Sequence, residues 1–208
     1  MKTYALSNGD QMPALGLGTW KSEPGEVYRA IRTAINVGYR HFDCAYIYEN
    51  EKEIGAAIQD AIITGEVNRE ELWITSKLWN THHRENEVQE CLQLTLNALQ
   101  LDYLDLYLVH WPVAQKKDVI FPRDASGLVS LNEISLEETW RGMEAIKSKG
   151  LAHHIGVSNF SAQKIEQVNQ SANYKIEVNQ VELHPLLQQT DLLDYCKKEN
   201  VVVTAYSP

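Results

Sequence analysis

The 208-residue sequence has few cysteines, few basic residues and no long apolar run. The three cysteines, Cys44, Cys91 and Cys196, are too few and too odd a set for a disulfide framework, which indicates a reducing compartment. No apolar run approaches the roughly 18 residues of a membrane span. The opening, MKTYALSNGD, lacks the apolar stretch of a secretory signal. We therefore expect a soluble, cytoplasmic protein.

Basic residues are outnumbered, because 19 Lys and Arg face 28 Asp and Glu and leave a net charge of -9. Nucleic acids and anionic membranes bind basic surfaces, so neither is an expected partner. The remaining composition, 44% hydrophobic and 23% charged, is that of a globular protein. A chain of this length needs no disulfide or metal to fold.

Short apolar runs alternate with amphipathic stretches along most of the chain. Residues 4–13 predict a β-hairpin, since Asn8-Gly9 is a strong turn signal. Seven short runs then follow that are nearly all apolar rather than alternating, which is typical of parallel strands buried on both faces. These runs are residues 15–20, 39–43, 72–77, 104–110, 153–159, 176–182 and 201–206.

Helical spacing of apolar residues between these runs predicts six helices. Ser135, with Glu138 in capping-box spacing, and also Ser161 and Thr190 are the expected N-caps. Gly38 and Gly150 stand where helices should end. Long β-α alternation implies a parallel sheet, either open and doubly wound or closed as a (β/α)8 barrel.

The barrel is favoured over the doubly wound sheet. A dinucleotide fingerprint needs Gly-x-Gly-x-x-Gly after the first strand, and Gly16-Leu17-Gly18-Thr19-Trp20-Lys21 lacks the third glycine. In a barrel the carboxyl ends of all strands meet at one mouth. The runs end on residues suited to chemistry, namely Trp20, Asp43, Lys77, His110, Asn159 and Tyr206, and the remaining run carries Gln180 and Glu182.

The expected fold is therefore an α/β (β/α)8 TIM barrel with an N-terminal β-hairpin, forming a single domain over residues 1–208. Seven strands are visible, whereas a full barrel takes eight strands and about 250 residues. Residues 201–206 look like a buried strand without a covering helix. We expect the eighth strand and last helices to be missing and the natural protein to continue past Pro208, by roughly 40–110 residues.

Asp43, Tyr48, Lys77 and His110 form the candidate catalytic set, since the barrel brings all four to one cavity. Each alone has an ordinary explanation, such as a buried ion pair or a core histidine. Together they suit carbonyl reduction, which needs a group that polarises the oxygen and an acid that protonates it. A lysine about 4 Å from Tyr48 would be worth about 4 kcal/mol at an effective dielectric near 20. We therefore expect Lys77 to lower the pKa of Tyr48, Asp43 to hold Lys77, and a neutral His110 to orient the carbonyl.

The residues GYRHFDCA, numbers 38–45, followed by Tyr48, Glu51 and Gly55, resemble the first signature of the aldo-keto reductases. Residues 155–160, IGVSNF, resemble most of that family's second signature, with His153 where Lys or Arg is usual. The resemblance covers the chain from about Leu6 to Pro208. The third signature, which holds the adenosine 2′-phosphate, would lie beyond Pro208.

This resemblance implies a barrel that uses NADPH to reduce a small aldehyde or ketone, sugars among them, with Tyr48 as general acid. The implied cofactor-binding residues are Thr19, Trp20, Asp43, Ser158, Asn159, Gln180, Tyr206 and Ser207. The implied substrate-binding residues are Trp20, Tyr48, Trp79, His110, Trp111 and Phe121. These aromatic side chains suit an apolar aldehyde better than a charged substrate. We expect a monomer without a metal.

Two other functions remain open. A non-catalytic cofactor-binding or structural protein could use the same barrel, although the intact set of four residues favours the enzyme. A metal-dependent barrel hydrolase ranks last, since no His-x-His follows the first strand. The pairs His82-His83 and His153-His154 have no carboxylate or cysteine at ligand spacing and are expected to be solvated.

Overall fold

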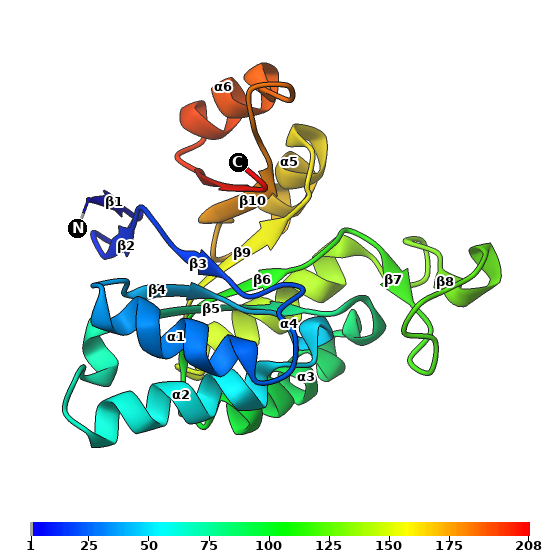
Figure 1. Cartoon of the computed structure of the whole chain (residues 1–208). Helices are drawn as coiled ribbons and strands as arrows, with labels where there is room; N and C mark the ends of the chain where they lie inside the picture. The colour runs from blue at the N-terminus through cyan, green and yellow to red at the C-terminus, as the bar shows by residue number, and fades with distance from the viewer. Residues whose placement is uncertain (1) are drawn as a thin grey trace.

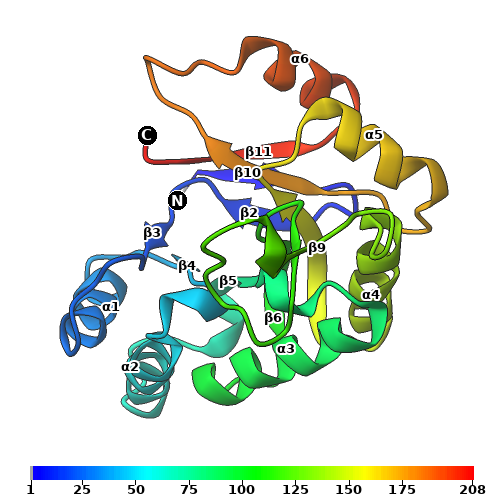
Figure 2. The ribbon, with the colours of Figure 1, turned by 90° about the vertical axis from the view of Figure 1, so that its right-hand side faces the viewer.

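A computed structural model, which describes residues 2–208, contains a seven-stranded parallel sheet in the order β11-β10-β9-β6-β5-β4-β3. The sheet curls like a barrel wall that is open between β3 and β11 (Figures 1 and 2). Its strands are β3 (Leu17–Gly18), β4 (His41–Asp43), β5 (Trp73–Leu78), β6 (Leu104–Val109), β9 (Ala152–Ser158), β10 (Val178–Glu182) and β11 (Val202–Tyr206). All seven expected parallel strands are confirmed, with small changes at their ends.

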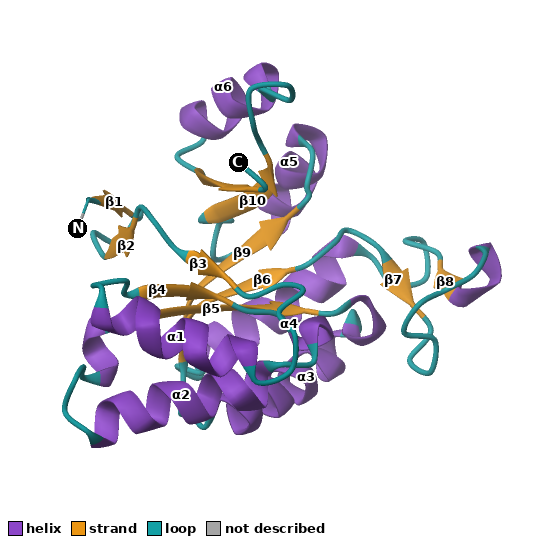
Figure 3. Cartoon of the chain, in the orientation of Figure 1, coloured by secondary structure: helices purple, strands orange, loops and turns teal. Residues whose placement is uncertain are grey.

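Helices follow the first six of these strands and lie outside the curled sheet (Figures 2 and 3). They are α1 (Glu26–Asn36), α2 (Glu51–Ile63), α3 (Glu85–Leu99), α4 (Leu136–Ser148), α5 (Ala162–Ser171) and α6 (Thr190–Lys198). Short 3-10 helices are η1 (Tyr46–Tyr48), η2 (Arg69–Glu71), η3 (Asn80–His82) and η4 (Ala125–Gly127). This alternation of strand and helix confirms the six helices that were predicted between the strands.

Local signals explain most helix ends. The hydroxyls of Ser135 and Ser161 accept hydrogen bonds from backbone N–H groups at the starts of α4 and α5, as expected of N-caps. Gly38 and Gly150 follow α1 and α4 with φ of 99° and 72°, a left-handed conformation that glycine adopts at low cost. The assignment of Thr190 is wrong by one residue, because the N-cap of α6 is Gln189.

Side chains alternate between the two faces of each strand, and this alternation determines which of them face the inside of the curled sheet. On β6, Leu106 and Leu108 join the smaller apolar cluster inside the curl, and His110 continues that face. Tyr107 and Val109 point outward into the larger cluster beneath the helices. The inner face therefore changes from apolar packing to polar side chains at the carboxyl ends of the strands.

Two hairpins lie at opposite ends of the strands (Figure 1). The expected hairpin is confirmed as β1 (Thr3–Ala5) and β2 (Gln11–Pro13), with Gly9 at φ 93° in its turn. At the carboxyl ends, the long loop after β6 contains β7 (Ala114–Gln115) and β8 (Leu128–Val129). The loop after β6 therefore lies at the carboxyl ends of the strands, where it can shape the opening of the barrel.

The expectation of solvated histidine pairs is wrong for three of the four rings. His82 and His83 are buried in and after η3, and Thr139 of α4 donates to the His83 carbonyl oxygen over 2.7 Å. His154 is buried, with its ring nitrogens 2.7 Å from Glu177 and 3.0 Å from Asp10. Packing of helix α4 and the hairpin over these rings could not be read from local spacing.

Candidate active site

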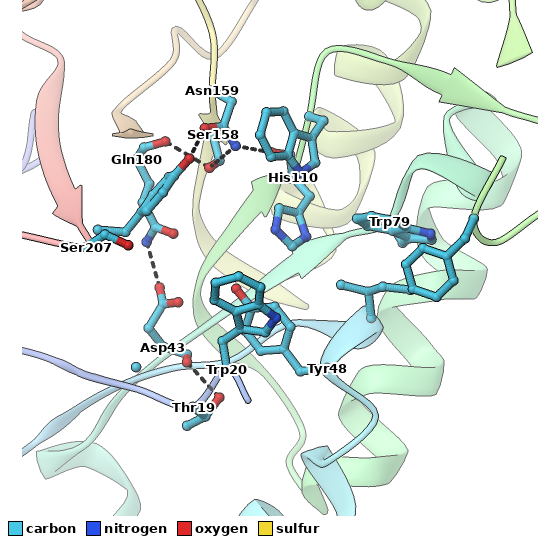
Figure 4. Close-up of a pocket in the computed structure, with 15 residues that line it drawn as sticks. Thr19, Trp20, Asp43, Tyr48, Trp79, His110, Ser158, Asn159, Gln180 and Ser207 are labelled. Atoms are coloured by element: carbon cyan, nitrogen blue, oxygen red, sulfur yellow. Dashed lines mark hydrogen bonds between the residues drawn. The ribbon is translucent and has the colours of Figure 1, made fainter. Parts of the chain in front are cut away.

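A cavity of about 460 Å³ opens at the carboxyl ends of the strands (Figure 4). This volume lies within the range of small-molecule sites, roughly 300–1,000 Å³. It is lined by Gly18, Thr19, Trp20, Asp43, Ile47, Tyr48, Trp79, His110, Trp111, Phe121, Ser158, Asn159, Gln180, Tyr206 and Ser207. The structure thus brings together all the predicted site residues except Lys77, which lies beneath the cavity and is 1% exposed.

Lys77 is the buried centre of the candidate catalytic group. Its Nζ donates to Asp43 Oδ1, to the carbonyl oxygen of Cys44 over 2.8 Å, and to Tyr48 Oη over 3.5 Å. Lys77 and Asp43 come from the adjacent strands β5 and β4, while Tyr48 ends η1 just beyond β4. The predicted contact between lysine and tyrosine is therefore present.

Lys77 lowers the pKa of Tyr48 as expected, but the expected net fall of that pKa is wrong. Burial raises the pKa of Tyr48 above its usual value, and the positive charge of Lys77 only partly offsets that rise. The Asp43 carboxylate adds to the rise, because it stands beside the same lysine. The charge of the lysine alone therefore does not set the pKa of Tyr48, because burial and the partner carboxylate act in the opposite direction.

Lys77 remains charged. Burial lowers the pKa of its ammonium, but the charge and hydrogen bond of Asp43, together with Tyr48 and Cys44, outweigh burial and the net shift is upward. A buried ammonium of this kind is stable only with a partner, so Asp43 and Lys77 form one unit.

His110 is neutral. Burial and the nearby charge of Lys77 lower the pKa of its ring to about 3. Nδ1 of the ring is buried and has no hydrogen-bond partner among the described residues. A neutral imidazole donates from one nitrogen only, so the burial of Nδ1 favours a proton on Nε2. The ring lies 5.9 Å from that of Tyr48, centroid to centroid, so both can face one bound atom.

The opposite wall of the cavity is a hydrogen-bonded group on β9, β10 and β11 (Figure 4). Asn159 Nδ2 donates to the His110 carbonyl oxygen over 3.0 Å, and Tyr206 Oη donates to Asn159 Oδ1 over 2.8 Å. Ser158 Oγ donates to the Gln180 carbonyl oxygen over 2.8 Å. Asn159 has φ of 63°, a left-handed conformation that asparagine tolerates better than most residues.

Aromatic rings close the remaining sides. The ring of Trp79 lies 5.3 Å from that of His110 and 6.2 Å from that of Phe121, and the ring of Trp20 lies 6.4 Å from that of Tyr48. Trp79 Nε1 also donates to the carbonyl oxygen of Ile120 over 3.3 Å, which ties the loop after β6 to the mouth. Phe121 is 70% exposed, so part of this wall is open to solvent.

Several supporting contacts were not predicted from the sequence. Thr19 Oγ1 donates to the Asp43 carbonyl oxygen over 2.9 Å, and Asn50 Nδ2 donates to the Thr19 carbonyl oxygen over 2.8 Å. Ile47, one residue before Tyr48, also lines the cavity. Buried Glu51 accepts from Ser76 Oγ over 2.6 Å, directly behind Lys77. Only the position of Glu51 within the first signature gave a signal.

Cys44 and Cys91 are buried packing residues, as expected. Burial raises the pKa of the Cys44 thiol well above its usual value and that of Cys91 to about 11, so neither is a thiolate near neutral pH. Within residues 2–208 no three His, Cys, Asp or Glu side chains are grouped as metal ligands. None of the helices described is long and apolar enough to cross a membrane.

The curled parallel sheet, with a cavity at the carboxyl ends of its strands, defines a barrel-type scaffold, and comparisons give the family. The model of the Aldo/keto reductase family matches residues 14–208, and the chain belongs to that family. It is 55% identical over 208 residues to the aldo/keto reductase slr0942 of Synechocystis sp. and 50% identical over 205 residues to aldo-keto reductase family 1 member A1 of Bos taurus. These matches cover 100% and 98% of this chain but 64% and 63% of the two relatives.

Solved structures agree with this assignment. The aldose reductase of Schistosoma japonicum superposes with a TM-score of 0.95 at 42% identity and covers 100% of this chain and 69% of its own. A Bombyx mori aldo-keto reductase, AKR2E4, in complex with NADP superposes with a TM-score of 0.89 at 39% identity, covering 99% of this chain and 66% of its own. The TIM-barrel fold expected from the sequence is thereby confirmed.

Proposed function

We propose that the protein reduces aldehydes or ketones, sugars among them, to alcohols with NADPH, and that Tyr48 is the general acid. The observation that carries this proposal is the contact of Tyr48 Oη with the buried, charged Lys77 at the floor of an aromatic cavity. Membership of the aldo/keto reductase family supports it. The chain spans about two thirds of the length of its relatives, so the activity is a proposal for the whole protein.

The cavity suits the nicotinamide part of the cofactor. Tyr206 offers a flat ring at its edge, and Ser158, Asn159 and Gln180 offer amide and hydroxyl groups beside it. Gln180 Oε1 has no hydrogen bond among the described residues, so it is free to accept from a carboxamide N–H. Thr19, Trp20, Asp43 and Ser207 are the other proposed contacts. When bound, the reduced nicotinamide would supply the hydride.

The side chains of this chain would then handle the carbonyl oxygen. Neutral His110 donates from Nε2 and orients that oxygen toward Tyr48. Because the pKa of Tyr48 is raised, its hydroxyl is protonated near neutral pH and ready to donate. The developing alkoxide is a much stronger base than a phenolate, so the proton moves from Tyr48 Oη to the substrate oxygen. Lys77 stabilises the phenolate that this transfer leaves behind.

The aromatic wall would select the substrate. Trp20, Trp79, Trp111 and Phe121 surround the mouth with apolar surface, which favours an uncharged aldehyde or ketone over an anionic one. The exposed side of Phe121 leaves room for a substrate that reaches past the loop after β6.

We also propose that the protein acts as a monomer in the cytoplasm. The three cysteines are unpaired and buried, which suits a reducing compartment.

The experiment is an NADPH-consumption assay with a panel of aldehydes, ketones and sugars, and with Tyr48→Phe as the paired variant. Consumption that requires both a carbonyl substrate and Tyr48 supports the proposal. A chain that binds NADPH without turnover on any carbonyl would instead favour the non-catalytic cofactor-binding function.

A further inference from the structure

The Asp43 carboxylate is held from two sides of the barrel. One oxygen, Oδ1, accepts from Lys77 on the neighbouring strand β5. The other, Oδ2, accepts from Gln180 Nε2 over 2.7 Å (Figure 4). Gln180 is on β10, 137 residues away in sequence, so this bond crosses the mouth of the curled sheet.

The backbone of Gln180 is firmly placed. Its carbonyl oxygen accepts from Asn159 N over 2.9 Å and from Ser158 Oγ over 2.8 Å. Strand β10 pairs with both β9 and β11, and Gln180 is only 5% exposed. A side chain on such a base has few alternative positions, so its amide can fix the rotation of the Asp43 carboxylate.

The partner determines which end of the Gln180 amide faces Asp43. An ionised carboxylate can only accept hydrogen bonds, so the amide nitrogen must point at Asp43. The amide oxygen is then left on the cavity side, where it can accept from a ligand. Gln180 can therefore contact a cofactor and Asp43 at the same time, through opposite ends of one amide.

We propose that Gln180 is a positioning residue for the acid: it directs Asp43 Oδ1 to Lys77 and disperses the carboxylate charge that Tyr48 feels. This inference rests on the proposed role of Tyr48. The charged and titratable groups around Tyr48 are Lys77, Asp43, Cys44, Tyr206 and the ring of His110. Among them, the Asp43 carboxylate raises the pKa of Tyr48 and so makes it a weaker acid. A hydrogen-bond donor on Asp43 Oδ2 disperses the carboxylate charge and reduces this rise.

The test follows the ionisation of Tyr48 in the cofactor-free 208-residue chain. Tyrosine labelled with carbon-13 at Cζ gives one resonance per ring, and Tyr48→Phe identifies the resonance of Tyr48. In Gln180→Met, which keeps the length but removes the donor, we expect the titration midpoint of Tyr48 to rise by on the order of half a unit to one unit. Gln180→Glu, which adds a second carboxylate beside Asp43, should raise it further.

Gln188→Met is the matched control, because it makes the same substitution at an exposed glutamine after β10, whose side chain donates to the Pro185 carbonyl oxygen and not to Asp43. It should leave the Tyr48 midpoint unchanged. A Tyr48 midpoint in both Gln180 variants equal to that of the wild type would overturn the inference. The Tyr48 titration needs no turnover, so failure of the reductase proposal would show separately, as a wild-type chain inactive on every carbonyl. Circular dichroism checks that each variant is folded. If Gln180→Met does not fold, the nearly isosteric Gln180→Glu keeps the test available.

Discussion

Lys77 Nζ lies 3.5 Å from Tyr48 Oη, yet the pKa of Tyr48 is raised. Burial of the phenol raises this pKa, and so does the carboxylate of Asp43, which contacts the same lysine. The lysine therefore does not make Tyr48 a phenolate at rest. Its proposed role comes later, when the proton has left and the new phenolate needs a positive neighbour.

Tyr48→Phe should abolish reduction, with a loss of about 10²–10⁴-fold in kcat. Phenylalanine keeps the ring that packs near Trp20 and His110, so NADPH binding should stay within a few-fold. Steady-state kinetics on a small aldehyde and a fluorescence titration with NADPH measure the two effects. Near-normal turnover by the variant would remove Tyr48 as the acid.

Lys77→Met should cost about as much activity as Tyr48→Phe, and the double variant should cost little more. Residues that act as one unit show effects that do not add. Lys198→Met is the control, because Lys198 lies on the surface with its side chain 81% exposed. Additive losses in the double variant would mean that Lys77 serves only as a structural ion pair.

The side chains at the strand ends were predicted well from the sequence, because the alternation of side chains along a strand is a local rule. Once residues 104–110 are a strand buried on both faces, Leu106, Leu108 and His110 must share one side. The family resemblance then predicted further site residues, such as Ser207, that the alternation along a strand does not identify. Contacts between distant strands, including the bond from Gln180 to Asp43, depend on the curl of the whole sheet, and no local pattern records it.

Burial was the other quantity that the sequence did not provide. The histidine pair 82–83 was expected to be solvated because no carboxylate or cysteine stands at ligand spacing, but both rings are buried and α4 packs against His83. The sign of the pKa shift of Tyr48 was missed for the same reason, since desolvation depends on every element around the ring.

Acid should destabilise the fold through His83 and His110. Burial lowers the pKa of each ring to about 3, far below the usual value of about 6.5. The unfolded chain therefore takes up these protons first, so stability is fully present above about pH 6.5 and declines as the pH falls toward about 3. Each histidine should lower the free energy of unfolding by about 2 kcal/mol between about pH 7 and about pH 5.

His83→Asn tests this dependence without touching the cavity. Urea unfolding at the two pH values should show a decline smaller by about 2 kcal/mol than in the wild type. The exposed His153→Asn should decline as the wild type does. An unchanged decline in His83→Asn would contradict a buried, neutral His83.

Gly55→Ala should destabilise the protein although alanine is the better helix former. A Cβ at Gly55 in α2 would lie 2.6 Å from the Ala98 carbonyl oxygen and 2.7 Å from the backbone of Leu99 in α3. We expect a loss of about 1–3 kcal/mol in the free energy of unfolding. Gly18→Ala, where a Cβ meets nothing within 4 Å, should change stability little. Equal stability of the two variants in urea would show that α2 can move away from α3.

The most direct test of the proposed chemistry is transfer of deuterium to an aldehyde from NADPH that carries deuterium at both C4 positions of the nicotinamide, followed by mass spectrometry of the alcohol. We predict an alcohol with one deuterium on the former carbonyl carbon, formed at least about 10²-fold faster by the wild type than by Tyr48→Phe. An alcohol without deuterium, or equal rates for the two proteins, would contradict hydride transfer with Tyr48 as the acid.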